Sequence, residues 1–147
     1  NLLDYKFYIA SLENYKDGNL PSKLYKKNVT WLGRLKRSEI FSFLERMQFC
    51  ILPNELNDEN NRYTSPMKLF EYLSSGKAII ASPINSVKEI LDKDSYYSLP
   101  NDIKNFPKFA KLLRESNPEE ISKKYHEVIQ KFTWENRAKK FINFIKS

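Results

Sequence analysis

Apolar and polar positions follow two different rhythms along the chain. Short apolar runs rich in β-branched and aromatic residues, typical of strands, alternate with stretches in which apolar residues recur every three or four positions, typical of amphipathic helices. Strands are expected at residues 5–10, 28–32, 48–52, 77–82 and 95–99. Helices are expected at residues 38–47, 66–75, 86–91, 106–115, 118–131 and 134–146.

This alternation predicts an α/β fold. Near-continuous apolar strands separated by helices favour a Rossmann-like parallel sheet with helices on both faces, and 147 residues are enough for one such domain. Parallel sheets of this kind bind ligands beyond the carboxyl ends of their strands. We therefore expect the functional loops to follow Leu32, Leu52 and Ser82. Residues 54–63, rich in Asn, Asp and Glu, are expected to form a polar loop.

The C-terminal segment, residues 133–147, contains the last expected helix, and this helix has an apolar face of its own. Trp134, Ala138, Phe141 and Ile145 recur at helical spacing. We expect this face to pack on the core, with Trp134 as its anchor.

The composition narrows the classes of partner. Lys and Arg exceed Asp and Glu by 25 to 18, a net charge of +7, which suits nucleic acid, acidic lipid or a nucleotide diphosphate. The basic residues are scattered, which argues against a nucleic-acid-binding arm. Since there is no long apolar run and no signal peptide, we expect a cytoplasmic protein. Any contact with the inner membrane is expected to be peripheral.

Two residues with reactive side chains are expected to be structural. Cys50 is the single cysteine, so an internal disulfide is excluded. It lies in an apolar strand, which indicates a packed core thiol. His126, the single histidine, lies in a charged helical pattern and is interpreted as a surface residue.

The most informative segment is residues 63–82, with the sequence YTSPMKLFEYLSSGKAIIAS. Ser65 suits a helix N-cap, and Pro66 suits the first helical position. Gly76 suits the residue that ends the helix in the left-handed conformation. The segment therefore predicts a loop, a helix, a turn and a strand in immediate succession.

Lys68 is unusual within this segment, because the first turn of a helix disfavours a cation. Two interpretations remain open. Lys68 and Glu71 are three residues apart and can form a surface ion pair. Alternatively, Lys68 and the free amides of the helix bind a phosphate, while Glu71 accepts hydrogen bonds from a ribose.

The segment resembles a known signature. PMKLFEYLSSGKAIIAS, at residues 66–82, is similar to the donor site of family 4 glycosyltransferases with the GT-B fold. Three flanking motifs agree in order: VTWLG at 29–33, FCILP at 49–53 and FTWE at 132–135. The resemblance covers roughly residues 5–145 and points to the C-terminal, nucleotide-sugar-binding domain of such an enzyme.

The resemblance implies roles for individual residues. Glu71 aligns with the glutamate that binds the donor ribose, and Tyr63 stands where the family has the glutamate that contacts the donor sugar. The remaining candidates are a loop beside the diphosphate and sugar (Thr64, Ser65, Met67), Lys68 toward the diphosphate, and a turn beside the base (Gly33, Arg34, Leu35). No catalytic residue is assigned.

The resemblance also implies an activity. The expected reaction transfers a hexosyl group from a nucleotide sugar to a glycan or lipid-linked acceptor in bacterial surface polysaccharide synthesis, without a metal or a further cofactor. Residues 1–147 would form the donor half. We expect the chain to be a fragment that lacks the N-terminal acceptor domain and is inactive in isolation. Because Tyr63 replaces the family's glutamate, an alternative function remains. The chain could be a non-catalytic Rossmann-like module that binds nucleotides or regulates another protein.

Overall fold

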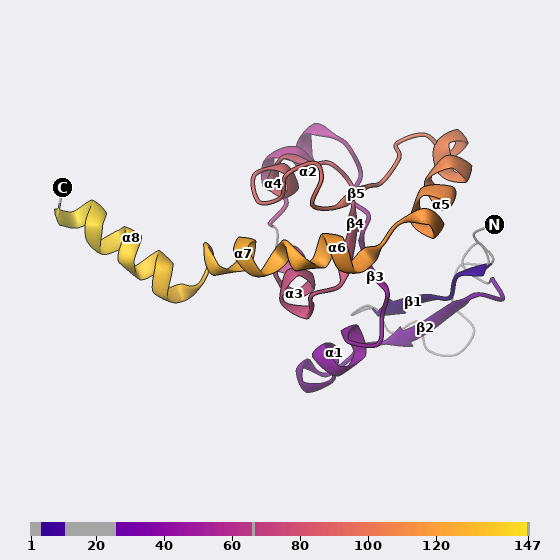
Figure 1. Cartoon of the computed structure of the whole chain (residues 1–147), viewed down its shortest axis with the longest axis horizontal. Helices are drawn as coiled ribbons and strands as arrows, with labels where there is room; N and C mark the ends of the chain where they lie inside the picture. The colour runs from indigo at the N-terminus through magenta and orange to yellow at the C-terminus, as the bar shows by residue number, and fades with distance from the viewer. Residues whose placement is uncertain (1–3, 11–25, 66, 147) are drawn as a thin grey trace. The chain divides into compact units, whose positions relative to one another are not determined.

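The computed structural model describes residues 4–10, 26–65 and 67–146 (Figure 1). The chain divides into two compact units, Asn1–Phe43 and Leu44–Ser147, and each is described here by itself. Both units contain parallel strands, so the predicted Rossmann-like α/β class is confirmed. Pro66, expected at the first position of a helix, lies outside the described residues.

The first unit contains a two-stranded parallel sheet. Strand β1 (Phe7–Ala10) pairs with β2 (Val29–Gly33), and Phe7 lies opposite Val29. Gly33 ends β2 at a φ of +65°, in the left-handed region that favours glycine. Helix α1 (Arg37–Leu44) follows. The rings of Tyr8 and Phe43 meet edge to face at 5.7 Å, which ties the end of α1 to β1.

The second unit is built on three parallel strands. Strand β4 (Ala78–Ala81) lies between β3 (Phe49–Leu52) and β5 (Tyr97–Ser98). All four residues of β4 are buried. Because side chains alternate across a strand, this strand is covered on both faces, as the sequence predicts.

Among the described residues, the second unit contains seven α-helices. They are α2 (Asp58–Tyr63), α3 (Met67–Ser75), α4 (Asn85–Lys88), α5 (Phe106–Glu115), α6 (Pro118–Lys123), α7 (Tyr125–Gln130) and α8 (Trp134–Lys146). A 3₁₀ turn, Ile103–Asn105, precedes α5. Helices α3 and α7 lie side by side in Figure 1, and α3 contacts β3, β4 and α7.

The core of this unit joins α3, β4, α4 and α7. Its buried members are Leu69, Leu73, Ile79, Ala81, Ile84, Val87, Leu91, Tyr96 and Tyr125. The backbone N–H of Ile79 donates a hydrogen bond of 3.0 Å to the buried hydroxyl of Tyr125, which fixes α7 to the central strand. Gly76 ends α3 at a φ of +66°, as predicted, and its N–H donates to the carbonyl of Leu73.

Cys50 is buried in β3, so its predicted place in the core is confirmed. Burial raises the pKa of its thiol to about 11, and a hydrogen bond with Ser75 lowers it in part. A thiol with so high a pKa is a poor nucleophile near neutral pH. His126 is exposed, as expected for a surface residue.

Two secondary-structure predictions were wrong in detail. Residues 58–63, the larger part of the expected polar loop at residues 54–63, form helix α2. Asp58 and Glu59 at its start and Arg62 at its end complement the helix dipole. These charged residues made the segment resemble a polar loop in the sequence. The single helix expected at residues 118–131 is interrupted at Lys124. The interruption directly precedes Tyr125, whose hydroxyl contacts β4.

The prediction that Trp134 anchors the last helix on the core was wrong. Its side chain is 84% exposed, and none of the described residues of α8 is buried. The guanidinium of Arg137 lies 5.6 Å from the centre of the Trp134 ring. Apolar periodicity correctly predicts the helix and its apolar face, but it does not specify what covers that face.

Across the described ranges, no helix combines the length and the apolar character needed to cross a bilayer.

Candidate functional site

The carboxyl ends of β3 and β4 lie side by side. Leu52, the last residue of β3, pairs with Ala81, the last residue of β4. The N–H of Ser82 donates to the carbonyl of Leu52 at 3.1 Å, which extends the pairing by one residue. The loop before α2 and the turn into α4 therefore leave the sheet at the same edge, where such folds bind ligands.

Two buried polar atoms lie just past this edge in the sequence. Asn54 follows β3 by two residues, and Ser86 lies in α4, which follows β4. Within the described part of the chain, neither Asn54 Oδ1 nor Ser86 Oγ has a hydrogen-bond partner, although both atoms are buried. Buried polar atoms in native proteins are normally satisfied. Both atoms are therefore candidates to contact a ligand or an ordered water.

Helix α3 begins near the same edge of the sheet. It connects the parallel strands β3 and β4, so it runs back against their direction and its N-terminus points toward their carboxyl ends. The free amides of its first turn form a site that favours anions. The first turn contains no acidic residue that would compete for such an anion.

Lys68 and Glu71 meet on this helix, as the sequence predicts. Lys68 Nζ lies 2.7 Å from Glu71 Oε2, and the two side chains are 58% and 34% exposed. This geometry is the surface ion pair of the first interpretation, worth a few tenths of a kcal/mol at this exposure. The pair also places a cation and a carboxylate together in the first turns of α3, so the structure is compatible with the second interpretation as well.

The described residues around the start of α3 are exposed or half-buried. Tyr63, the last residue of α2, is 78% exposed, and Met67, the first residue of α3, is 70% exposed. Ser65 is exposed and Thr64 is half-buried. These side chains are accessible to a ligand from solvent.

The turn expected beside the base belongs to the first unit. Gly33 ends β2, Arg34 is exposed and Leu35 is half-buried. The role of these three residues beside a base stays a prediction.

A hollow lies at the other end of α3. It has a volume of about 320 Å³ and is lined in part by Gly76, Ser122 and His126. Since Gly76 immediately precedes β4, this hollow lies toward the amino end of that strand. Ligands of parallel α/β folds bind at the opposite edge, so the first turn of α3 is the stronger candidate site.

Sequence reasoning did not identify Asn54 and Ser86. Their position in the sequence could have indicated them, because each follows the carboxyl end of a predicted strand. Their burial, and the absence of a partner for either atom among the described residues, are visible only in three dimensions.

Parallel strands, a helix N-terminus at their carboxyl edge and polar groups beside it define a Rossmann-like ligand-binding protein. The chain belongs to the glycosyl transferase-like family, whose model matches residues 1–143. A comparison with curated proteins gave no match.

Proposed function

We propose that this chain is the C-terminal, donor-binding half of a family 4 glycosyltransferase with the GT-B fold. The observation that carries the proposal is the 2.7 Å pair of Lys68 and Glu71 at the N-terminal end of α3. The membership of the glycosyl transferase-like family supports it. The donor is a nucleotide sugar, and the acceptor is a glycan or a lipid-linked molecule. The reaction belongs to the synthesis of bacterial surface polysaccharide and takes place in the cytoplasm.

The free and bound states use the same two side chains differently. In the free protein, the carboxylate of Glu71 is the partner of the Lys68 ammonium. When a nucleotide sugar binds, its diphosphate takes the place of that carboxylate beside Lys68 and the helix amides. Glu71 is then released to accept hydrogen bonds from the ribose hydroxyls. Thr64, Ser65 and Met67 line the diphosphate and sugar.

This arrangement also assists the chemical step. When the bond between sugar and diphosphate breaks, negative charge builds up on the leaving phosphate. Lys68 and the N-terminus of α3 stabilise that charge without a metal ion. The acceptor is supplied by a separate N-terminal domain, and transfer requires both reactants in one cleft. We therefore propose that the chain alone binds the donor but does not turn it over.

Calorimetric titration with UDP and with GDP tests the ribose contact. Because a hydrogen bond to a charged group contributes about 1.5–3 kcal/mol, Glu71→Ala should weaken binding of the preferred nucleotide about ten- to a hundredfold. The matched control is Glu115→Ala, which removes the carboxylate of another helical surface pair, Lys111–Glu115 at 3.7 Å. Equal affinities for the two variants would show that Glu71 forms only a surface ion pair.

A second titration tests the phosphate contact. Lys68→Ala should weaken binding of the nucleoside diphosphate more than binding of the nucleoside, while Lys111→Ala should leave both unchanged. Because added salt screens exposed charges, the difference should shrink as ionic strength rises. If Lys68→Ala affects nucleoside and nucleoside diphosphate equally, Lys68 does not contact the phosphates.

A second candidate function is favoured by one residue. Tyr63 occupies the position of the family's sugar-contacting glutamate, and its side chain is 78% exposed. A module that binds nucleotides without catalysis would need no sugar contact. Comparison of UDP with UDP-sugars, and of GDP with GDP-sugars, separates the two functions. A donor-binding half should bind at least one nucleotide sugar more tightly than the matching diphosphate, whereas a regulatory module should not distinguish them.

A further inference from the structure

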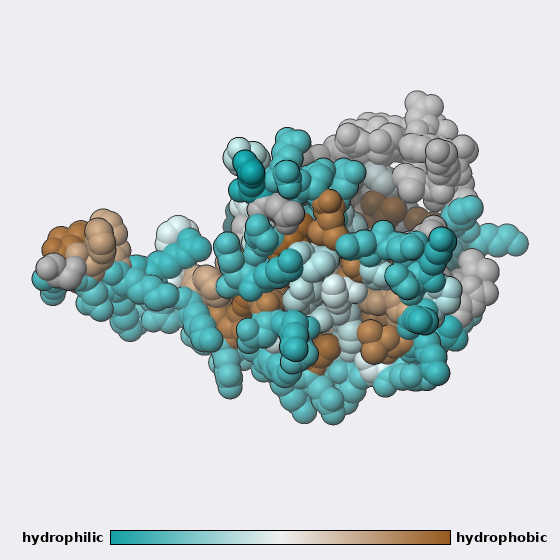
Figure 2. All heavy atoms as spheres, turned by 90° about the horizontal axis from the view of Figure 1, so that it is seen from above, coloured by the Kyte–Doolittle hydropathy of each residue, from teal (hydrophilic) through white to brown (hydrophobic). Residues whose placement is uncertain are grey.

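Unpartnered groups of two kinds stand out among the described residues. Figure 2 shows hydrophobic side chains gathered on one side of the outer end of α8, with hydrophilic side chains along the other. Exposed apolar surface is common in proteins and does not by itself identify a partner. Buried polar atoms without a partner are rare, because each loses its hydrogen bonds with water and gains none in return. The oxygens Asn54 Oδ1 and Ser86 Oγ are of this second kind.

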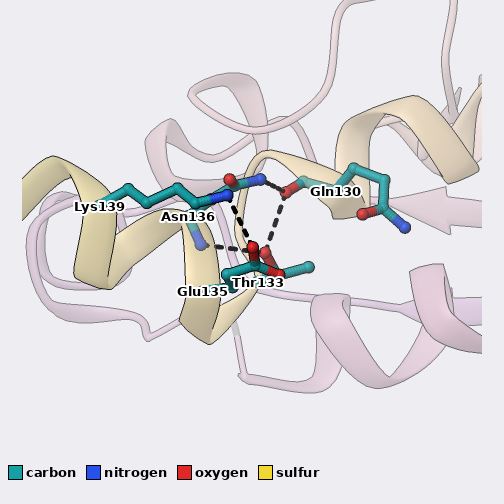
Figure 3. Close-up of polar contacts among 5 residues, drawn as sticks. All are labelled: Gln130, Thr133, Glu135, Asn136 and Lys139. Carbon is teal, nitrogen blue, oxygen red and sulfur yellow. Dashed lines mark hydrogen bonds and ion pairs between the residues drawn. The ribbon is translucent and has the colours of Figure 1, made fainter.

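Other hydroxyl and amide groups of the chain have partners close by in the sequence. At the start of α8, Thr133 Oγ1 accepts from the backbone N–H of Asn136 and donates to the carbonyl of Gln130 (Figure 3). The side-chain amide of Asn136 donates to the same carbonyl. Four serines in or next to helices donate to a carbonyl three or four residues earlier: Ser74, Ser75, Ser116 and Ser122. Among the described residues, Asn54 Oδ1 and Ser86 Oγ have no such local partner, which sets them apart.

Asn54 and Ser86 lie on neighbouring elements at one edge of the sheet. The backbone N–H groups of Asn54 and Ser82 both donate to the carbonyl of Leu52, at 3.2 and 3.1 Å. The turns after β3 and β4 therefore share one acceptor. Helix α2, which follows Asn54, contacts α4, which contains Ser86. Both unpartnered oxygens thus belong to the region where the chain leaves the carboxyl ends of the two strands.

The backbone around Ser86 is held in place, while the two side chains can turn. Ile84 and Val87, which lie on either side of Ser86, are both 0% exposed. Asn54 and Ser86 themselves are half-buried. Rotation about a side-chain bond carries a serine hydroxyl or an amide oxygen to another allowed position without moving the main chain. A ligand at the sheet edge can therefore reach both oxygens without rearranging the fold.

We propose that Asn54 and Ser86 bind the sugar of the nucleotide-sugar donor through its hydroxyl groups. The inference rests on the proposed function, in which the N-terminus of α3 binds the diphosphate and Glu71 binds the ribose. Glu71 lies about one turn into α3, so the ribose is bound on the side away from the carboxyl edge of the sheet. The sugar is attached to the other phosphate and extends toward that edge.

The chemistry of the two side chains fits sugar hydroxyls. An amide oxygen accepts hydrogen bonds, and a serine hydroxyl both accepts and donates them. A sugar hydroxyl also accepts and donates, so it can pair with either group. Neither Asn54 nor Ser86 carries a charge that would favour the phosphates. The two residues therefore contribute to recognition of the sugar and not of the diphosphate.

Calorimetric titration separates the sugar from the rest of the donor. UDP and GDP are compared with UDP-glucose, UDP-galactose, UDP-N-acetylglucosamine and GDP-mannose. For the nucleotide sugar that binds most tightly, Asn54→Ala and Ser86→Ala should each weaken binding about three- to tenfold, the contribution of one hydrogen bond. The affinity for the matching diphosphate should change less than about twofold, because the diphosphate does not reach the two oxygens.

Two matched controls remove groups that already have partners. Ser122→Ala removes a half-buried helical hydroxyl that donates to a carbonyl of its own helix at 3.0 Å. Asn57→Ala removes a half-buried amide from the loop that contains Asn54, and this amide donates to a neighbouring carboxylate at 3.2 Å. Both variants should bind the nucleotide sugar as the parent does. Losses in the controls equal to those in Asn54→Ala and Ser86→Ala would overturn the assignment.

The stability of the free chain gives an independent measurement. Ser86→Ala removes a buried oxygen that has no partner among the described residues, so the urea midpoint should stay unchanged or rise. A lower urea midpoint, together with equal weakening of diphosphate and nucleotide-sugar binding, would show that the hydroxyl supports the fold through an ordered water. That result would overturn the proposed contact.

Failure of this inference is distinguishable from failure of the proposed function. If the parent chain binds a nucleotide sugar and Asn54→Ala and Ser86→Ala bind it equally tightly, the two residues face another partner, such as the separate N-terminal domain. The inference is then wrong, while the donor site stands. If the parent chain binds none of these nucleotides, the proposed function fails and the inference fails with it.

Discussion

Helices α3 and α8 have the same kind of sequence pattern but opposite surroundings. Both carry an apolar stripe at helical spacing. In α3 the stripe is buried: Leu69 is 0% and Leu73 is 2% exposed. In α8 no described residue is buried. The comparison teaches that periodicity defines a face, while contacts far apart in the sequence decide whether that face is covered.

Chain connectivity explains why α3 is covered. It lies between β3 and β4, which pair along their whole length from Phe49–Ala78 to Leu52–Ala81. A helix that joins two adjacent parallel strands must return across their sheet, which places its apolar stripe on them. Helix α8 follows β5, and within the described residues no later strand draws it back onto the sheet.

The largest effect is expected when a buried side chain of α3 is shortened. Leu69→Ala should lower the free energy of unfolding by about 2–5 kcal/mol, because it leaves a cavity in a fully buried site. The urea midpoint measured by circular dichroism gives this value. A loss below about 1 kcal/mol would mean that the stripe of α3 is not the core of the second unit.

Alkaline pH should weaken the same core. Burial raises the pKa of Cys50 from 9.0 to about 11 and that of Tyr72, on α3, from 10.0 to about 12. The folded state therefore holds protons that the unfolded state releases, so stability is complete below pH 9 and falls as pH rises toward these folded-state values. Between pH 8 and pH 10 we expect a loss of about 2 kcal/mol.

Urea unfolding at each pH measures this slope, and Cys50→Ala supplies the control. That variant should lose the larger part of the dependence in this range, because its unfolded-state pKa is the lower of the two. An unchanged slope in Cys50→Ala would assign the dependence to other groups, such as Tyr125, whose pKa burial also raises.

The end of α3 provides a smaller effect. Gly76→Ala should cost roughly 1–2 kcal/mol, because a Cβ is disfavoured at a φ of +66°. A Cβ at this position would meet no atom within 4 Å, so the cost is conformational rather than steric contact with neighbours. Thermal unfolding of Gly76→Ala beside Gly76→Asn checks this, since Asn tolerates the left-handed region better and should cost less.

The smallest effect is expected on α8. Ile145→Ala should change the free energy of unfolding by less than about 0.5 kcal/mol, because the side chain is 66% exposed. Urea unfolding of the chain measures it. A loss comparable to that of Leu69→Ala would show that α8 is covered in solution and would remove the contrast between the two helices.

Local patterns were sufficient for much of the fold. The bounds of α5 and α8 are those predicted, because proline or an N-cap precedes a clear apolar period in each. Helix α2 escaped prediction because its residues are almost all polar, so no apolar period marks it. The exposure of Trp134 was not predicted, because a helical wheel contains no information about neighbours distant in the sequence.

The candidate site was predictable to a similar degree. The spacing of Lys68 and Glu71 places them on one side of α3, and they do meet. The burial of Asn54 and Ser86 depends on how the loops after β3 and β4 pack, which sequence spacing does not encode. That the functional loops follow the carboxyl ends of the strands stays a prediction.

The single buried cysteine gives the second unit an intrinsic probe of its own opening. Cys50 is 4% exposed in β3, next to the strand that α3 precedes, so a thiol reagent reaches it only when this region opens. At high reagent concentration the labelling rate equals the opening rate, and at low concentration it reports the population of open molecules. A ligand that binds at the carboxyl edge slows this labelling in proportion to its occupancy. Its affinity is thereby measured without catalytic turnover and without an engineered label.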